Sequence, residues 1–88
     1  MKHRIWKFEL STAPTAGLIM PAGAKVLTVA AQGERVCIWA LCDPDAPKEN
    51  RDFTILGTGF SAPPDASAYL GTAHTTDGFV WHVFEGLV

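Results

Sequence analysis

The sequence is poor in positive charge. It holds seven Lys and Arg residues against nine Asp and Glu residues, which gives a formal net charge of −2 over 88 residues. Proteins that bind nucleic acids mass Lys and Arg along a phosphate track. The cations of this chain are scattered and form no such track, so we expect no nucleic-acid partner.

Metal-binding residues are also scarce. The two cysteines, Cys37 and Cys42, have neither the spacing nor the further ligands of a zinc knuckle, and they do not form a C-x-x-C redox pair. The histidines, His3, His74 and His82, form no H-x-H or H-x-x-x-H pair. We therefore expect no metal and no cofactor, and we interpret both thiols as small buried apolar side chains.

Long apolar runs are missing as well. The first apolar stretch, residues 5–10, is interrupted by Lys7 and Glu9. Such a beginning fits neither a signal peptide nor a membrane span. We therefore expect no membrane partner, a cytoplasmic location and reduced thiols.

Helical hydrophobic periods of useful length do not occur either. The chain has instead short runs of β-branched and apolar residues, separated by turns that contain Gly, Pro or Asp. These runs are residues 5–10, 18–20, 25–32, 35–41, 53–56, 69–73 and 79–85. Spacing of roughly 8–12 residues is typical of all-β folds. It predicts a single all-β domain over residues 1–88, a small antiparallel barrel or sandwich of about seven short strands.

Three of these runs are apolar on both faces. Successive side chains of a strand point to opposite sides, and segments 26–31, 36–41 and 79–84 have few polar residues on either side. No helix is predicted that could cover a second face, so that face must meet another sheet or another copy of the chain. With 48% hydrophobic residues, the chain is expected to form a homo-oligomer. The alternative is a tight monomeric barrel with scattered exposed apolar residues.

No arrangement of residues indicates catalysis. A Ser-His-Asp order, a pair of carboxylates or a nucleophile elbow cannot be argued from this sequence, so we expect no catalytic residues and no enzyme. Gly57-Thr58-Gly59 is compatible with an anion-binding loop. It lacks the Lys and the helix of a phosphate loop, and we interpret it as a strand end or bulge.

Five residues are candidate ligand contacts: Trp39, Lys48, Arg51, Trp81 and His82. A cation beside a tryptophan can hold a nucleotide, because the cation binds phosphate and the ring stacks on the base. The His82 imidazole can donate to a phosphate or a carboxylate. The alternatives are solvated loop charges at Lys48 and Arg51, and a hydrogen-bonded strand histidine at His82.

Several blocks of the sequence resemble a known family. These blocks are IWKFEL, MPAGAKVLTVAAQ, CIWALCDPDAP, FTILGTGF, YLGT and VWHVFE. From Ile5 to Glu85 the chain resembles an uncharacterised family of short phage and prophage proteins. Cys42 stands where that pattern leads us to expect valine, which supports a core role for this thiol. The resemblance implies a viral origin and action in the cytoplasm of an infected bacterium, and it implies no activity and no catalytic residues.

Three functions fit these observations. The favoured hypothesis is a phage-encoded accessory binding protein, a homo-oligomer that counters host defence by sequestering a nucleotide-like signal in a pocket between subunits. The second is a protein–protein inhibitor of a host enzyme, with Trp39, Trp81 or Phe60 as its hot spot. The third is a minor structural protein of the virion.

Overall fold

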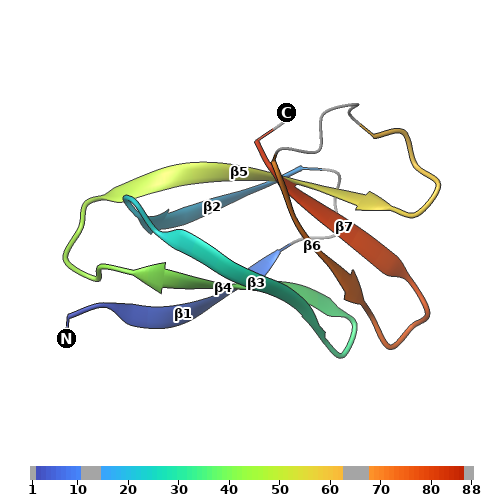
Figure 1. Ribbon diagram of the computed structural model, residues 1–88, viewed down its shortest axis with the longest axis horizontal. Helices are drawn as coiled ribbons and strands as arrows, with labels where there is room; N and C mark the ends of the chain where they lie inside the picture. Colours follow the sequence, from blue (N-terminus) through green and yellow to red (C-terminus); the bar gives the residue numbers. More distant parts are fainter. Residues whose placement is uncertain (1, 11–14, 63–67, 87–88) are drawn as a thin grey trace.

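The computed structural model describes residues 2–10, 15–62 and 68–86. These residues form strands and no helix, which confirms the all-β prediction (Figure 1). The strands are β1 (Arg4–Leu10), β2 (Thr15–Pro21), β3 (Lys25–Gln32), β4 (Arg35–Cys42), β5 (Lys48–Gly57), β6 (Tyr69–His74) and β7 (Val80–Glu85). No helix that could span a membrane occurs in the described part of the chain.

The strands form two antiparallel sheets packed as a sandwich. The three-stranded sheet has the order β1-β4-β3 and the four-stranded sheet the order β2-β5-β7-β6. The sheets approach each other closely between β3 and β6, and they are not closed into a barrel. The β3–β4 and β6–β7 turns lie at the same end of the molecule, where the Thr76 amide donates to the Gly33 carbonyl at 2.9 Å (Figure 1).

The core lies between the sheets and is built by inward-facing side chains of every strand. In β5 these are the odd-numbered residues, with Phe53 and Ile55 buried against the other sheet. Alternate residues of β4 do the same in the three-stranded sheet. The central members of this core are Leu10, Met20, Val29, Val36, Ile38, Ala40, Phe53, Ile55 and Val83.

Two strand boundaries were predicted incorrectly. The second strand was predicted over residues 18–20, but β2 covers Thr15–Pro21, so residues 15–17 belong to a strand and not to a loop. The strand predicted over residues 53–56 begins at residue 48, so the charged residues 48–51, which were expected in a loop, form the first part of β5. Their charges are compatible with a strand, because Lys48, Glu49 and Asn50 are exposed to water. Arg51 points inward and finds a carboxylate partner, Glu85, on β7. The predicted loop at residues 61–67 lies mostly outside the described residues.

Both cysteines are buried, and they lie on opposite faces of β4, as their spacing predicted. Cys42 faces the core. Cys37 faces outward, where an ion pair and a hydrogen bond between β1 and the β3–β4 hairpin flank it. These contacts are Arg35–Glu9 at 3.0 Å and Lys7–Gln32 at 2.8 Å. Burial raises the pKa of both thiols, which disfavours their reactive thiolate forms.

Gly71 marks the closest approach of β6 to β3. A Cβ atom at Gly71 would lie 3.0 Å from Cβ of Val29, which is itself buried in the core. We expect Gly71→Ala to lower the free energy of unfolding by about 1–3 kcal/mol, the usual cost of overpacking. Urea denaturation measures this change.

Gly17→Ala is the matched control for this prediction. Its Cβ would meet the side-chain oxygen of Asn50 at 3.1 Å, and that exposed side chain can move away. We expect this variant to be as stable as the wild type or slightly more stable, because alanine restricts the unfolded chain. Equal destabilisation by both substitutions would show that the loss at Gly71 does not come from its close approach to Val29.

The Asp-Pro turn between β4 and β5 is closed by Asp43. Its Oδ1 accepts a hydrogen bond from the Asp45 amide at 3.0 Å, and Lys2 Nζ lies 3.2 Å from Oδ2. The hydrogen bond from Asp45, followed by the interaction with Lys2, lowers the pKa of the Asp43 carboxyl below its ordinary value of 3.8.

This lowered pKa predicts an acid-sensitive turn. A group whose pKa is depressed by folding stabilises the protein above its unfolded pKa, and the stabilisation is lost as the pH falls through the folded pKa. Titration of the Asp43 carboxyl carbon by NMR is expected to give a midpoint below 3.8. A midpoint at or above that value would show that the hydrogen bond from Asp45 is not formed in solution.

Candidate functional site

Two adjoining pockets open on the four-stranded sheet, where β5 ends. The first, of about 210 Å³, is lined by Leu56, Gly57, Thr58, Gly59, Phe60, Ala62, Tyr69, His82 and Phe84. The second, of about 370 Å³, is lined by Gly57, Thr58, Phe60, Gly78, Phe79, Val80 and Trp81. Gly57, Thr58 and Phe60 belong to both, so a short segment of chain forms their common wall.

The backbone after β5 positions this wall. β5 ends at Gly57, as the interpretation of Gly57-Thr58-Gly59 predicted, and the Phe60 amide donates to the Gly57 carbonyl at 3.1 Å. Gly59 has φ +91°, a conformation that residues with side chains rarely adopt. The turn folds the Phe60 ring against Gly57, where an added Cβ would lie 3.1 Å from the ring.

A line of polar side chains crosses the floor of the first pocket. His82 pairs with Thr72 across β7 and β6, and its Nδ1 lies 3.1 Å from the Thr72 hydroxyl. Its Nε2 lies 2.8 Å from the Thr58 hydroxyl. The Tyr69 hydroxyl in turn bonds the Thr72 hydroxyl. Because a hydroxyl can donate or accept, this line can satisfy either tautomer of the imidazole and can change its donors when a ligand binds.

Aromatic side chains concentrate around the two pockets. Phe60, Tyr69 and Phe79 are exposed by 62%, 45% and 56%, and they are the exposed aromatic residues of the described chain. Two ring pairs support the walls: Tyr69 meets Phe84 edge to face at 5.4 Å, and Phe79 lies 5.6 Å from Trp81 between ring centroids. Exposed rings that line concave surfaces offer stacking surfaces for a flat ligand.

The pockets are nearly neutral. Among the described lining residues there is no Lys, Arg, Asp or Glu. In the same part of the chain, no three His, Cys, Asp or Glu residues converge as metal ligands. The arrangement therefore favours an uncharged ring with hydrogen-bonding groups over a phosphate or a carboxylate.

A family model for a domain of unknown function, DUF7352, matches residues 1–87. The chain belongs to the DUF7352 family. The match covers both pockets and all the strands. No curated protein and no solved structure matches the chain.

Two of the five predicted ligand contacts line the pockets of this DUF7352 chain, on opposite faces of β7. Trp81 lines the second pocket and His82 the first. Trp39 lies on the outer face of the other sheet, in register with Lys7 and Thr28. Lys48 lies over the ring of Trp6, at 5.3 Å from its centroid. Neither Trp39 nor Lys48 lines the pockets.

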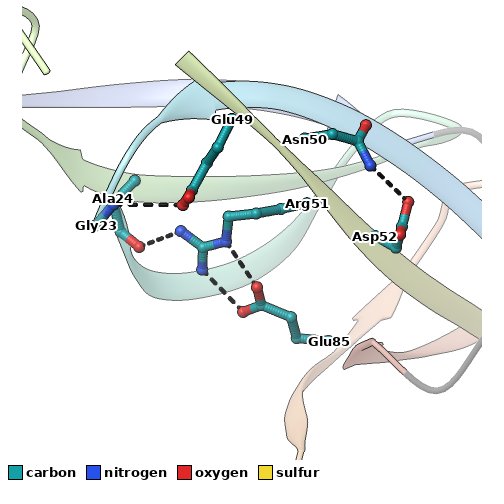
Figure 2. Close-up of polar contacts among 7 residues, drawn as sticks. All are labelled: Gly23, Ala24, Glu49, Asn50, Arg51, Asp52 and Glu85. Atoms are coloured by element: carbon teal, nitrogen blue, oxygen red, sulfur yellow. Dashed lines mark hydrogen bonds and ion pairs between the residues drawn. The ribbon is translucent and has the colours of Figure 1, made fainter. Parts of the chain in front are cut away.

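Arg51 takes part in a structural contact. Its Nε and Nη2 donate to the Glu85 carboxylate at 2.7 and 2.9 Å, and Nη1 donates to the carbonyl of Ala24, the residue before β3 (Figure 2). The hydrogen bond that Arg51 donates to Glu85 raises the pKa of the Arg51 guanidinium. Arg51 thus connects β5 to β7 and to the other sheet, and it does not line either pocket.

Sequence reasoning missed Thr58, Tyr69 and Phe84 as members of this DUF7352 site. Phe60 had been considered, but as a hot spot for a protein partner. A partial signal was present, because His82 and Phe84 alternate on one face of β7 and Gly57-Thr58-Gly59 ends β5 beside them. Tyr69 pairs with Phe84 across β6 and β7, and this strand register cannot be predicted from the local sequence pattern.

Proposed function

We propose that this DUF7352 chain is a non-catalytic binding protein that holds a nucleotide-like small molecule by its base. The observation that supports this most is the neutral first pocket, where the exposed residues Phe60 and Tyr69 lie beside the hydrogen-bonded side chains around His82. A nucleobase is a flat, uncharged ring with donors and acceptors on its edge. Because no Lys or Arg lines the described pockets, the phosphates of such a ligand are expected to point into solvent.

The biological role in this proposal rests on the resemblance to short phage and prophage proteins. In the cytoplasm of an infected bacterium, a protein that occupies a nucleotide-like immune signal would counter host defence without chemistry. Sequestration requires affinity and abundance, and a small domain with a preformed pocket provides the first of these.

Calorimetry with adenosine, AMP and ADP-ribose tests the proposal. We expect adenosine and AMP to bind with similar affinity, because the phosphate makes no ionic contact. Phe60→Ala is expected to abolish this binding. Ile19→Ala is the control, because Ile19 is equally exposed, at 63%, and lies on the same sheet at a distance from the pockets. Absence of binding by all three compounds would contradict the proposal.

Self-association is a second part of the proposal. Ile5 and Leu41 are paired across β1 and β4 on the outer face of the three-stranded sheet, and they are exposed by 62% and 37%. Trp39 lies next to them on the same face. Apolar residues grouped in this way are typical of subunit contacts. Light scattering is expected to give a multiple of 9.5 kDa that Leu41→Lys reduces, and a monomeric mass at tens of micromolar would contradict association.

Direct inhibition of a host enzyme is the second candidate function. The exposure of Phe60 and Phe79 favours it, because large exposed aromatic residues often carry the binding energy of protein interfaces. A pull-down from host lysate with the wild type and Phe60→Ala separates this function from ligand binding. A host enzyme that is captured only by the wild type, together with silent calorimetry, would favour inhibition.

A further inference from the structure

We infer that β1 is an open sheet edge that pairs with β1 of a second copy of the chain, antiparallel and in one register, with Phe8 opposite the partner's Phe8. The two three-stranded sheets then continue as one sheet across the contact. This goes beyond the contact proposed at Ile5 and Leu41, which lies on the face of that sheet and not at its edge. The feature that supports it is the order of charges along β1.

β1 is an edge strand with one side open. It pairs with β4, and no strand of the described chain pairs with its other side. Figure 1 shows β1 at the lower left margin of the molecule. Backbone N–H and C=O groups on the open side of an edge strand have no partner in the sheet, so they can pair with a strand of another chain.

The other three edge strands have features that interrupt pairing. β2 contains Gly17 and ends at Pro21, which has no amide hydrogen to donate. β3 and β6 each have a register shift in their pairing, and they lie close to each other. β1 has no proline, no glycine and no register shift over Arg4–Leu10. Because bulges and prolines protect sheet edges from further pairing, β1 is the edge best suited to add a strand.

The charges of β1 select the register. When two copies extend one sheet, opposite residues share a face, so the two-fold axis passes through one residue that lies opposite itself. An axis at Lys7 or at Glu9 places like charges opposite each other, and an axis at Trp6 pairs Lys7 with Ile5 and forms no ion pair. An axis at Phe8 places Lys7 of each copy opposite the partner's Glu9. Opposite charges at such positions stabilise an antiparallel pair, so this register is favoured.

The inner face of β1 fits the same register. Trp6 and Phe8 pack against the core but are only partly buried, whereas Leu10 is buried. With the axis at Phe8, the two Phe8 rings lie opposite each other and Trp6 lies opposite the partner's Leu10. Cross-strand pairs of aromatic and apolar residues stabilise antiparallel strands. Pairing of the two edges therefore covers apolar surface that a single copy leaves partly exposed.

The contacts that Lys7 and Glu9 make within the chain leave them able to bind a partner. Lys7 Nζ donates to Gln32 Oε1 at 2.8 Å, and Arg35 Nη1 lies 3.0 Å from Glu9 Oε2. All four side chains are exposed. An ammonium group has three donors and a carboxylate two oxygens, so each can add a contact across the edge and keep the first.

Light scattering of the full chain carrying Leu41→Lys tests the edge alone, because this substitution removes the proposed face contact. At tens of micromolar we expect a mass of twice 9.5 kDa. In this background, Lys7→Glu or Glu9→Lys places like charges opposite each other and is expected to weaken the dimer about ten-fold or more. The two substitutions together restore opposite charges across the edge and are expected to restore the dimer.

Glu34→Lys is the control, because it makes the same change of charge as Glu9→Lys at an exposed position in the β3–β4 turn. It is expected to leave the dimer intact. The double variant still lacks the Arg35–Glu9 ion pair, so its recovery cannot come from a repaired fold.

A monomeric mass for Leu41→Lys, or a double variant as weakly associated as the single ones, would overturn the inference. An associated wild type would then leave the face contact standing. Calorimetry with adenosine judges the ligand site separately, because no residue of β1 lines either pocket.

Discussion

Phe53→Ala is expected to lower the free energy of unfolding by about 3–5 kcal/mol, the usual cost of removing a buried phenylalanine ring. Phe53 is fully buried on the inner face of β5, between Ala16 on β2 and the end of β7. Its removal leaves a cavity among rigid strands that cannot collapse into it. Because a small domain has little stability to spare, urea denaturation should place the variant near the limit of folding.

Phe60→Ala is the control for Phe53→Ala, and it tests whether Phe60 is a surface residue of the pocket or a structural residue of the core. It makes the same chemical change a few residues later, but Phe60 is 62% exposed and packs against Gly57 outside the core. We expect a change of less than about 0.5 kcal/mol in the free energy of unfolding, as for most surface substitutions. A loss comparable to that of Phe53→Ala would show that Phe60 is a structural residue, and the pocket would lose its central wall.

Arg51→Ala is expected to lower the free energy of unfolding by about 2–3 kcal/mol, because it leaves a partly buried carboxylate without its partner. The Arg51 side chain is 16% exposed and that of Glu85 is 32% exposed. The substitution also removes the donor to the Ala24 carbonyl, which connects the two sheets (Figure 2). Thermal and urea denaturation both measure the change.

Arg35→Ala is the control for this prediction. Arg35 also forms an ion pair, with Glu9 at 3.0 Å, but the two side chains are exposed by 69% and 50%. Exposed ion pairs contribute about 0–1 kcal/mol, so we expect a loss near the lower end of that range. A loss at Arg35 as large as that at Arg51 would mean that exposure does not decide the strength of these pairs.

Much of the fold follows from local patterns. The alternation in residues 5–10 and the apolar runs at 25–32 and 35–41 gave β1, β3 and β4 almost to the residue. The first part of β5 did not follow, because clustered charges are common in turns. In this fold, Arg51 is stabilised in a strand by Glu85, which is 34 residues away in sequence. A partner so distant leaves no mark on local periodicity.

The site was predictable only in part, for a related reason. Trp81 and His82 could be chosen because they lie on a strand with two apolar faces. Tyr69 and Phe60 join them through the β6–β7 register and the turn at Gly59, and both are properties of the folded chain. Lys48 was a reasonable candidate as a free cation, but the fold places it over Trp6.

The two-sided apolar pattern also has an explanation within one chain. Cys37 lies on an outer face and is nevertheless buried, with Lys7 and Arg35 making contacts across the strands beside it. Long polar side chains can cover apolar surface with their methylene stems. The same outer face leaves Ile5 and Leu41 exposed, and this pair is where association is to be tested.

Residue-resolved NMR during titration with adenosine asks most directly whether the pocket over β5 and β7 is a ligand site. We predict that the shifted amide signals concentrate at Gly57–Phe60, Tyr69, Thr72, His82 and Phe84. Signals of β1, β3 and β4 are predicted to stay in place. Shifts centred on the outer face of the three-stranded sheet, or no shifts at saturating adenosine, would contradict the assignment of this pocket as a ligand site.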